Sequence, residues 1–242
     1  MSTESYHQRR PFLARGSKII RCEACQMPAQ VCICDYRVNA RAQARFWLLT
    51  HPKEFYKPTN TGRLIVDTIH NSETFAWSRT EPDDQLLSQL NDPGFDPYIV
   101  FPEGEAYQDR MVDFEHKPGR EPVFIILDGT WRQARRIFRQ SEYLQSVPVI
   151  QPNTQRKTRY NLRKPNEDHH LCTAEVAAVM LEQMGDSRSA ALLDAYFDVF
   201  NAHYYAARRS RMIEGVDEAK ALLKQAISLA IPAAGDHEAD SR

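Results

Sequence analysis

Apolar residues in this chain fall into two kinds of stretch, short unbroken runs and longer segments with helical spacing. Residues 123–127 (VFIIL) form such a run between Pro122 and the Asp128-Gly129 pair. A short apolar run bounded by Pro and Gly is typical of a strand buried on both faces, as in a parallel sheet. Comparable patterns predict further strands at residues 45–50, 73–78, 98–101 and 147–150.

Segments with helical spacing lie between and after these strands. Thr59 or Asn60 is expected to cap a helix that begins nearby, and Thr173 carries a helix-start signal. Further helices are predicted at residues 82–92, 132–145, 187–209 and 211–229. The third of these is amphipathic, with an inner face formed by Leu192, Leu193, Tyr196, Phe197 and Phe200. Strands alternating with helices, followed by a helical C-terminal segment, predict an α/β fold with a mostly parallel sheet.

The remaining stretches predict connections and tails. Residues 107–120 read as an exposed, charged connection. Residues 151–170 form a long polar and basic connection, which in a compact domain is usually functional or disordered. We expect a flexible tail at residues 1–18 and a disordered acidic tail at residues 231–242.

The residues directly after the central run are candidates for chemistry. Open α/β sheets bind ligands outside the carboxyl ends of their strands, and Asp128, Thr130 and Trp131 follow there. A structural interpretation explains these residues about as well as a chemical one. In it, Asp128 or Thr130 caps the next helix and Trp131 belongs to the core. The sequence alone leaves both open. At another strand end His51 is weak evidence, because most such histidines are structural.

Four of the five cysteines lie within thirteen residues. Their spacing, C-x2-C-x6-C-x-C, fits one small knuckle around a tetrahedral zinc ion. Four thiolates leave no open coordination position, so the metal would be structural; an iron–sulfur cluster is a weaker alternative. The ligands would be Cys22, Cys25, Cys32 and Cys34. The separate Cys172 is expected to be a small buried apolar residue.

Charge distribution is more informative than net charge. The 242 residues include 31 Lys+Arg and 32 Asp+Glu, a net charge of -1. Basic side chains are nevertheless concentrated in residues 120–165, and a basic face on a neutral protein is consistent with phosphate binding. The residues considered for nucleic-acid contact are Arg63, Arg132, Arg135, Arg136, Arg156, Arg159 and Arg163.

Several classes of protein are disfavoured. No apolar run approaches the roughly 18–20 residues that span a bilayer, and the first 18 residues lack the apolar core of a signal peptide. We therefore expect a soluble, cytoplasmic protein. The sequence contains neither GxGxxG nor GxxxxGK[ST], so a Rossmann dinucleotide site and a P-loop are unlikely.

Taken together, five motifs in order resemble the DTW-domain family, over roughly residues 20–205. The Asp-x-Thr-Trp signature is residues 128–131, and the cysteine knuckle precedes it. The others are His51-Pro-Lys-Glu54 followed by Asn60-Thr-Gly-Arg-Leu64, the Phe101-Pro102 loop, and an STxE-like segment at residues 172–175. In the last, Cys172 stands where the family usually has Ser.

The resemblance implies a fold and an activity. The fold would be SPOUT-like: a mostly parallel α/β sheet with a knotted, helical C-terminal region and a small N-terminal zinc knuckle. The expected division is a knuckle at residues 19–40 and a catalytic domain at residues 41–230. The activity would be transfer of the 3-amino-3-carboxypropyl group from S-adenosylmethionine to N3 of a tRNA uridine, at position 47 of the variable loop in bacterial members. Methylthioadenosine would be released.

The resemblance also assigns roles. Asp128 and then Glu175 are the candidates for removing the N3 proton, although either could hold the ligand's α-amino group instead. Thr130 and Trp131 complete the catalytic set, and Trp131 is a candidate for stacking on a base. S-adenosylmethionine would be held by Phe101, Pro102, Leu127, Asp128, Gly129, Thr130, Trp131, Leu171, Cys172, Thr173 and Glu175. The arginines named above would meet the tRNA backbone, and no obligate protein partner is implied.

Three alternatives remain at this stage. The chain could be a SPOUT-type RNA methyltransferase using the same co-substrate. It could be a zinc-knuckle RNA-binding protein without catalysis. Ribosomal RNA could replace tRNA as the substrate, although a net charge of -1 slightly disfavours a deep ribosomal position.

Overall fold

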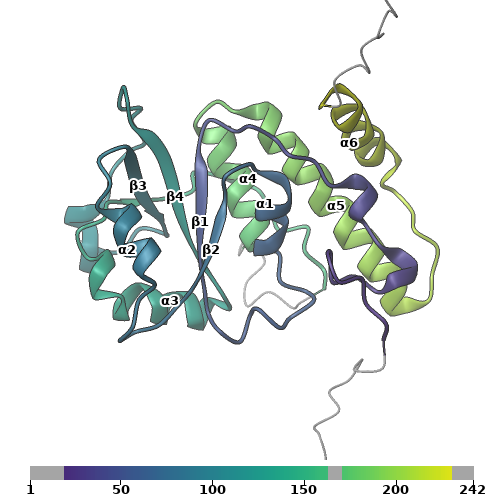
Figure 1. Ribbon diagram of the computed structural model, residues 1–242, viewed down its shortest axis with the longest axis horizontal. Helices are drawn as coiled ribbons and strands as arrows, with labels where there is room; N and C mark the ends of the chain where they lie inside the picture. The colour runs from purple at the N-terminus through teal and green to yellow at the C-terminus, as the bar shows by residue number, and fades with distance from the viewer. Residues whose placement is uncertain (1–18, 163–170, 231–242) are drawn as a thin grey trace, which may run out of the picture.

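The computed structural model describes residues 19–162 and 171–230, which form an α/β fold around one parallel sheet (Figure 1). The sheet has five strands in the order β2-β1-β4-β3-β5, and all four strand pairs are parallel. The strands are β1 (Arg45–Thr50), β2 (Glu73–Ala76), β3 (Phe95–Val100), β4 (Glu121–Asp128) and β5 (Val149–Ile150). The predicted α/β class and parallel sheet are confirmed.

The apolar run that we took as central lies in the middle strand. β4 is buried from Pro122 to Asp128 and pairs with β1 on one side and β3 on the other. Asp128 lies opposite Thr50, the last residue of β1, and Ile126 lies opposite Val100, the last residue of β3. The three strands therefore end close together at one edge of the sheet.

Helices cover both faces of the sheet, which explains why β4 is apolar without alternation. Phe124 and Ile126 face the larger core, together with residues of α1, α4 and α5. Val123, Ile125 and Leu127 face the smaller core, together with α2 and α3. Figure 1 shows these two groups of helices on opposite sides of the strands. The helices are α1 (Gly62–Thr68), α2 (Asp84–Leu90), α3 (Trp131–Gln140), α4 (Thr173–Gln183), α5 (Ser187–Arg209) and α6 (Asp217–Ala230).

Several boundaries differ from the predictions. The helix predicted at residues 211–229 begins only at Asp217, because Ser210 and Gly215 have positive φ angles of 51° and 72°. The helix predicted at 132–145 ends at Gln140 and is followed by a 3-10 turn, η4 (Glu142–Leu144). The strand at 73–78 stops at Ala76. The charged connection starts with a 3-10 segment, η3 (Glu105–Arg110).

The cysteine knuckle packs against the main fold. It contains two 3-10 turns, η1 (Ala29–Val31) and η2 (Cys34–Tyr36). Met27 and Ile33 are fully buried in the larger core, alongside residues of α5. His203 of α5 lies with its Nδ1 3.2 Å from the carbonyl oxygen of Val31. The knuckle and α5 therefore share one hydrophobic core.

Some expectations fall outside the described residues. These are the two predicted tails, residues 1–18 and 231–242, and Arg163, which belongs to the stretch 163–170. Within the described part of the chain, no helix is both long enough and apolar enough to cross a membrane.

Candidate functional site

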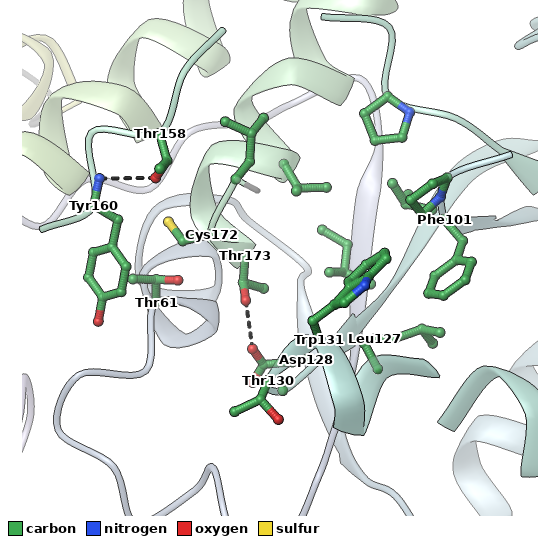
Figure 2. A pocket seen from close by; sticks show the side chains of 18 of the residues that line it. Thr61, Phe101, Leu127, Asp128, Thr130, Trp131, Thr158, Tyr160, Cys172 and Thr173 are labelled. Atoms are coloured by element: carbon green, nitrogen blue, oxygen red, sulfur yellow. Dashed lines mark hydrogen bonds between the residues drawn. The ribbon is translucent and has the colours of Figure 1, made fainter. Parts of the chain in front are cut away.

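A cavity of about 660 Å³ lies at the carboxyl edge of the sheet. It is bounded by the ends of β3 and β4, the turn 59–61 before α1, residues 151–160 after β5, and the start of α4 (Figure 2). Small-molecule sites in proteins typically enclose about 300–1,000 Å³. Its walls contain ten of the eleven residues that the family resemblance assigns to S-adenosylmethionine: Phe101, Pro102, Leu127, Asp128, Gly129, Thr130, Trp131, Leu171, Cys172 and Thr173.

Asp128 is the polar centre of this cavity. Its side chain is buried and accepts hydrogen bonds from Thr50 Oγ1 at 3.1 Å, Asn60 Nδ2 at 2.7 Å and Thr173 Oγ1 at 2.8 Å. The Thr173 contact is visible in Figure 2. Burial raises the pKa of the Asp128 carboxyl, while the bonds from Asn60 and Thr173 oppose that shift. One carboxylate thus joins β1, the turn before α1 and the start of α4.

The approach of α1 to Asp128 leaves little room for a side chain at Gly62. A Cβ added to Gly62 would lie 3.0 Å from three atoms of the Asp128 carboxyl group. Such a contact is closer than van der Waals distance, so a larger residue would push α1 away. The cap of α1 also differs from our prediction, because the N-cap residue is Thr61 and its side chain makes no capping bond. Asn60 does accept a bond from the backbone nitrogen of Arg63, at 3.3 Å.

Thr130 has the structural role that the sequence left open. It is the N-cap of α3 and forms a capping box with Gln133. The Thr130 backbone nitrogen donates to Gln133 Oε1 at 2.7 Å, and the Gln133 nitrogen donates to Thr130 Oγ1 at 3.4 Å. The capping interpretation is therefore confirmed for Thr130, whereas the side chain of Asp128 faces the cavity. The chemical role of Asp128 stays a prediction.

Trp131 forms part of an aromatic wall. Its ring stacks on Phe101 with centroids 5.4 Å apart and planes at 15°, and Phe101 stacks on Phe138 at 4.4 Å. The Arg135 guanidinium lies over the indole at 5.4 Å. Trp131 is half-buried and also lines the cavity. It offers a flat face to a ligand and is held in place by the smaller core.

Glu175 lies just behind the cavity rather than in its wall. It is buried and forms the capping box of α4, accepting from the Cys172 backbone nitrogen at 2.9 Å. It also accepts from Thr158 Oγ1 at 2.7 Å and from the Arg159 backbone nitrogen at 2.6 Å. Glu175 therefore fastens the segment after β5 to the start of α4. Burial raises the pKa of the neighbouring Cys172 thiol, which stays protonated at neutral pH.

The segment after β5 is further clamped by ion pairs. Arg156 pairs with Glu182 of α4 and with Asp194 of α5, the latter at 2.8 Å. Arg159 pairs with Asp194 at 2.8 Å and with Asp198 at 2.6 Å. These pairs fold the segment over the cavity, and Tyr160 adds a hydrogen bond to the Thr59 carbonyl at 2.5 Å.

The arginines predicted to contact RNA thus fall into two groups. Arg156 and Arg159 are paired with carboxylates, and Arg63 is largely buried, where it donates to the Pro58 carbonyl at 3.0 Å. Burial lowers the pKa of Arg63. The second group lies on the exposed face of α3 and has no carboxylate partner among the described residues. It comprises Arg132, Arg135, Arg136 and also Arg139.

The turn after β1 was noted only as a family motif, and no role was predicted for Glu54. Glu54 is fully buried and pairs with Lys57. Its charge helps to raise the pKa of Asp128. His51 stacks on Trp77 with centroids 5.7 Å apart, and burial lowers its pKa. A Glu and a Lys three residues apart directly after a strand were the available signal.

The four knuckle cysteines form a candidate metal centre. Their Sγ atoms all lie within 4.8 Å of one another, and two pairs, Cys22–Cys34 and Cys25–Cys32, are 3.6 Å apart. Tetrahedral zinc with bonds of about 2.3 Å requires sulfur separations of about 3.8 Å. Backbone N–H groups of Cys25 and Ala24 lower the pKa of Cys22 to about 6, whereas burial raises the pKa of Cys32 and of Cys34. The donor set and spacing fit a structural metal ion.

The fold and the cavity define an α/β domain with a cavity of small-molecule size at the carboxyl edge of a parallel sheet. A family model, DTW domain, matches residues 19–205, and the chain belongs to this family. This match confirms the resemblance that the sequence motifs suggested.

Two curated relatives carry the same name, tRNA-uridine aminocarboxypropyltransferase 2. The protein from Mus musculus is 27% identical over 171 residues, covering 66% of this chain and 55% of its own length. The protein from Macaca fascicularis is 26% identical over 168 residues, with the same coverage of 66% and 55%. The chain therefore spans about half the length of these relatives. No solved structure matches it significantly.

Proposed function

We propose that this protein is a tRNA modification enzyme that transfers the 3-amino-3-carboxypropyl group of S-adenosylmethionine to N3 of a tRNA uridine. The observation that carries the proposal is the cavity, which the DTW segment, the Phe101-Pro102 loop and the start of α4 build together. The relatives' names support the transfer of an aminocarboxypropyl group to a tRNA uridine. We further propose position 47 of the variable loop as the target and the cytoplasm as the location.

The reaction needs positioning more than activation of the donor. Uracil N3 loses its proton and attacks the γ-carbon of the aminocarboxypropyl group. The new N–C bond forms as the C–S bond breaks, so the sulfonium becomes the neutral thioether of methylthioadenosine. The protein has to present the γ-carbon rather than the methyl group to N3, which is catalysis by orientation.

Asp128 is the better placed of the two candidate bases. It lines the cavity, and its buried position raises its pKa, which makes the carboxylate more basic. Glu175 does not line the cavity and instead joins the segment after β5 to the start of α4, which supports a positioning role. We propose that Trp131 and Phe101 provide the flat surface for a ring of substrate or donor, and that Thr130 fixes the start of α3.

The other expected partners fit around this site. The exposed arginines of α3 would contact the tRNA backbone, because they follow directly on the cavity wall and lack carboxylate partners in the described chain. Zinc would be held by the four cysteines and would stabilise the fold without taking part in transfer. The SPOUT relationship and a knotted C-terminal region belong to the proposal through the family resemblance alone, and an experimental structure tests them through the path of the backbone.

The test is mass spectrometry of nucleosides from unmodified tRNA incubated with the protein and S-adenosylmethionine. We expect aminocarboxypropyluridine with the native protein, a loss of at least about 100-fold with Asp128→Asn, which falls within the 10²–10⁴-fold range of acid–base catalysis, and a smaller loss with Glu175→Gln. Melting curves of both variants show whether they remain folded.

Other products would select the alternatives. Methyluridine would identify an RNA methyltransferase. An unchanged nucleoside profile with tRNA bound would favour a non-catalytic RNA-binding protein. Modification of ribosomal RNA in place of tRNA would show that ribosomal RNA is the substrate.

A further inference from the structure

The turn after β1 exposes two aromatic side chains beside the cavity. Tyr56 is 89% exposed and Phe55 is 49% exposed. Within the described part of the chain, the Tyr56 ring makes no ring contact and its hydroxyl no hydrogen bond. An aromatic side chain left open to water forgoes the burial that usually stabilises it. We refer to residues 51–60 as the aromatic turn.

The aromatic turn is firmly anchored beneath these exposed rings. Within the turn, Glu54 is fully buried and pairs with Lys57. The backbone nitrogen of Glu54 donates to the His51 carbonyl at 2.8 Å, that of Lys57 to the Glu54 carbonyl at 3.0 Å, and that of Asn60 to the Lys57 carbonyl at 2.8 Å. Phe55 and Tyr56 are therefore presented on a preorganised turn, which lowers the entropic cost of binding.

Chain geometry places the aromatic turn at the rim of the cavity. Thr59 and Asn60 line the cavity. Tyr56 is three residues before Thr59, so their Cα atoms are at most about 11 Å apart. On its other side the turn touches α3, where the His51 Nδ1 and Gln133 Nε2 atoms are 3.2 Å apart.

The charges around the turn indicate the kind of partner. α3 begins at the contact with His51 and carries four exposed arginines, and Lys53 is exposed on the turn itself. Exposed aromatic rings next to uncompensated basic side chains are typical of single-stranded nucleic-acid sites, in which bases stack on the rings and the cations meet phosphates. A uridine that enters the cavity must leave its own stack, which costs free energy. An aromatic side chain at the rim of the cavity can stack on the base next to that uridine and so replace its lost stacking partner.

We propose that Tyr56, supported by Phe55, stacks on a base that flanks the target uridine of the substrate RNA. The inference rests on the proposed function, since it takes the RNA that enters the cavity as the occupant. It assigns Tyr56 and Phe55 to substrate binding and gives these two side chains no part in the transfer step.

The test compares equilibrium binding of unmodified tRNA to the native protein and to variants of Tyr56. Stacking on one base is worth a factor of about 5 to 150 in affinity. We expect Tyr56→Ala and Tyr56→Leu to weaken binding by a factor in this range, and Tyr56→Phe to bind as the native protein does. Met212→Ala, at a residue 81% exposed in the connection between α5 and α6, is the matched control.

The outcomes separate this inference from the proposed reaction. Native affinity in Tyr56→Ala, or native affinity in Tyr56→Leu, would overturn stacking by Tyr56. So would an equal loss in Met212→Ala, or the absence of any tRNA binding by the native protein. Nucleoside analysis with the native protein tests the reaction on its own. Weaker binding by Tyr56→Ala without any transferred group would keep the stacking site and reject the enzyme.

Discussion

At the scale of single residues, Asp128 combines two roles that usually belong to different side chains. Three hydrogen bonds tie it to β1, to the turn before α1 and to α4, so it holds the cavity together. The same side chain is the carboxylate that lines the space for a ligand. Substitution of Asp128 is therefore expected to affect stability as well as transfer, and both need to be measured.

His51 gives a prediction for the dependence of stability on pH. Burial and the charge of Arg136 lower its pKa from the ordinary value of 6.5. The unfolded chain then binds more protons than the folded protein between the two pKa values, so stability is lost as the pH falls below about 6.5. Between pH 7 and pH 5, we expect the free energy of unfolding to fall less in His51→Gln than in the native protein. The difference between the two slopes is at most about 1.4 kcal/mol per pH unit.

Urea unfolding of the native protein and His51→Gln at closely spaced pH values measures this difference. His203, whose pKa is also lowered by burial, contributes with the same sign in both proteins and cancels. Equal slopes in the two proteins would contradict the prediction.

At the scale of elements, the two faces of α3 differ in chemistry. Ala134, Ile137 and Phe138 are buried and hold the helix on the sheet. The arginines point to solvent, and the helix starts at the cavity through the cap of Thr130. The basic segment after β5 works differently, because the carboxylates of α4 and α5 neutralise Arg156 and Arg159.

This contrast predicts a salt effect on tRNA binding. We expect Arg132→Gln to reduce the slope of log K against log salt by about 0.7–0.9, the value for one lost phosphate contact. Titrations at several salt concentrations measure the slope. Arg211→Gln is the matched control, since Arg211 is an exposed arginine just beyond the end of α5. A slope that changes as much in the control as in Arg132→Gln would contradict the assignment.

At the scale of the whole molecule, the knuckle and the α/β domain stabilise each other. Met27 and Ile33 complete the larger core beside α5, and the same core supports α1 and α4 under the cavity. A metal ion at the cysteines would fix the position of these apolar residues. The division into a knuckle at 19–40 and a catalytic domain at 41–230 remains a prediction, because the two parts share this core.

Removal of the metal should therefore destabilise the whole chain. We expect Cys34→Ser to lose the metal and about 3–5 kcal/mol of stability, a fall in Tm of about 6–20 °C at 2–4 °C per kcal/mol. Metal analysis and thermal unfolding measure both effects. Cys172→Ser should keep the metal, because this cysteine caps α4. A native Tm in metal-free Cys34→Ser would reject a structural role for the metal. Iron instead of zinc in the native protein would indicate that the four cysteines hold an iron–sulfur cluster.

The amino-acid sequence by itself determined the features that depend on neighbours along the chain. Strand β4, helix α5 and the cysteine cluster follow from short-range patterns, and each was predicted. The cap at Thr130 is also local, and it was one of the interpretations that the sequence left open. Membership in the DTW family followed from motifs of the same local kind.

Only the tertiary structure decided which distant residues meet. Arg159 and Asp198 are 39 positions apart, and their pairing removes a cation that the sequence assigned to RNA. Glu175 turns towards Thr158 instead of the cavity, whereas Thr173, two residues earlier, reaches Asp128. The physical reason is that hydrogen bonds and ion pairs depend on separations of about 3 Å in space, and these are set by the order of strands in the sheet and the packing of helices on it.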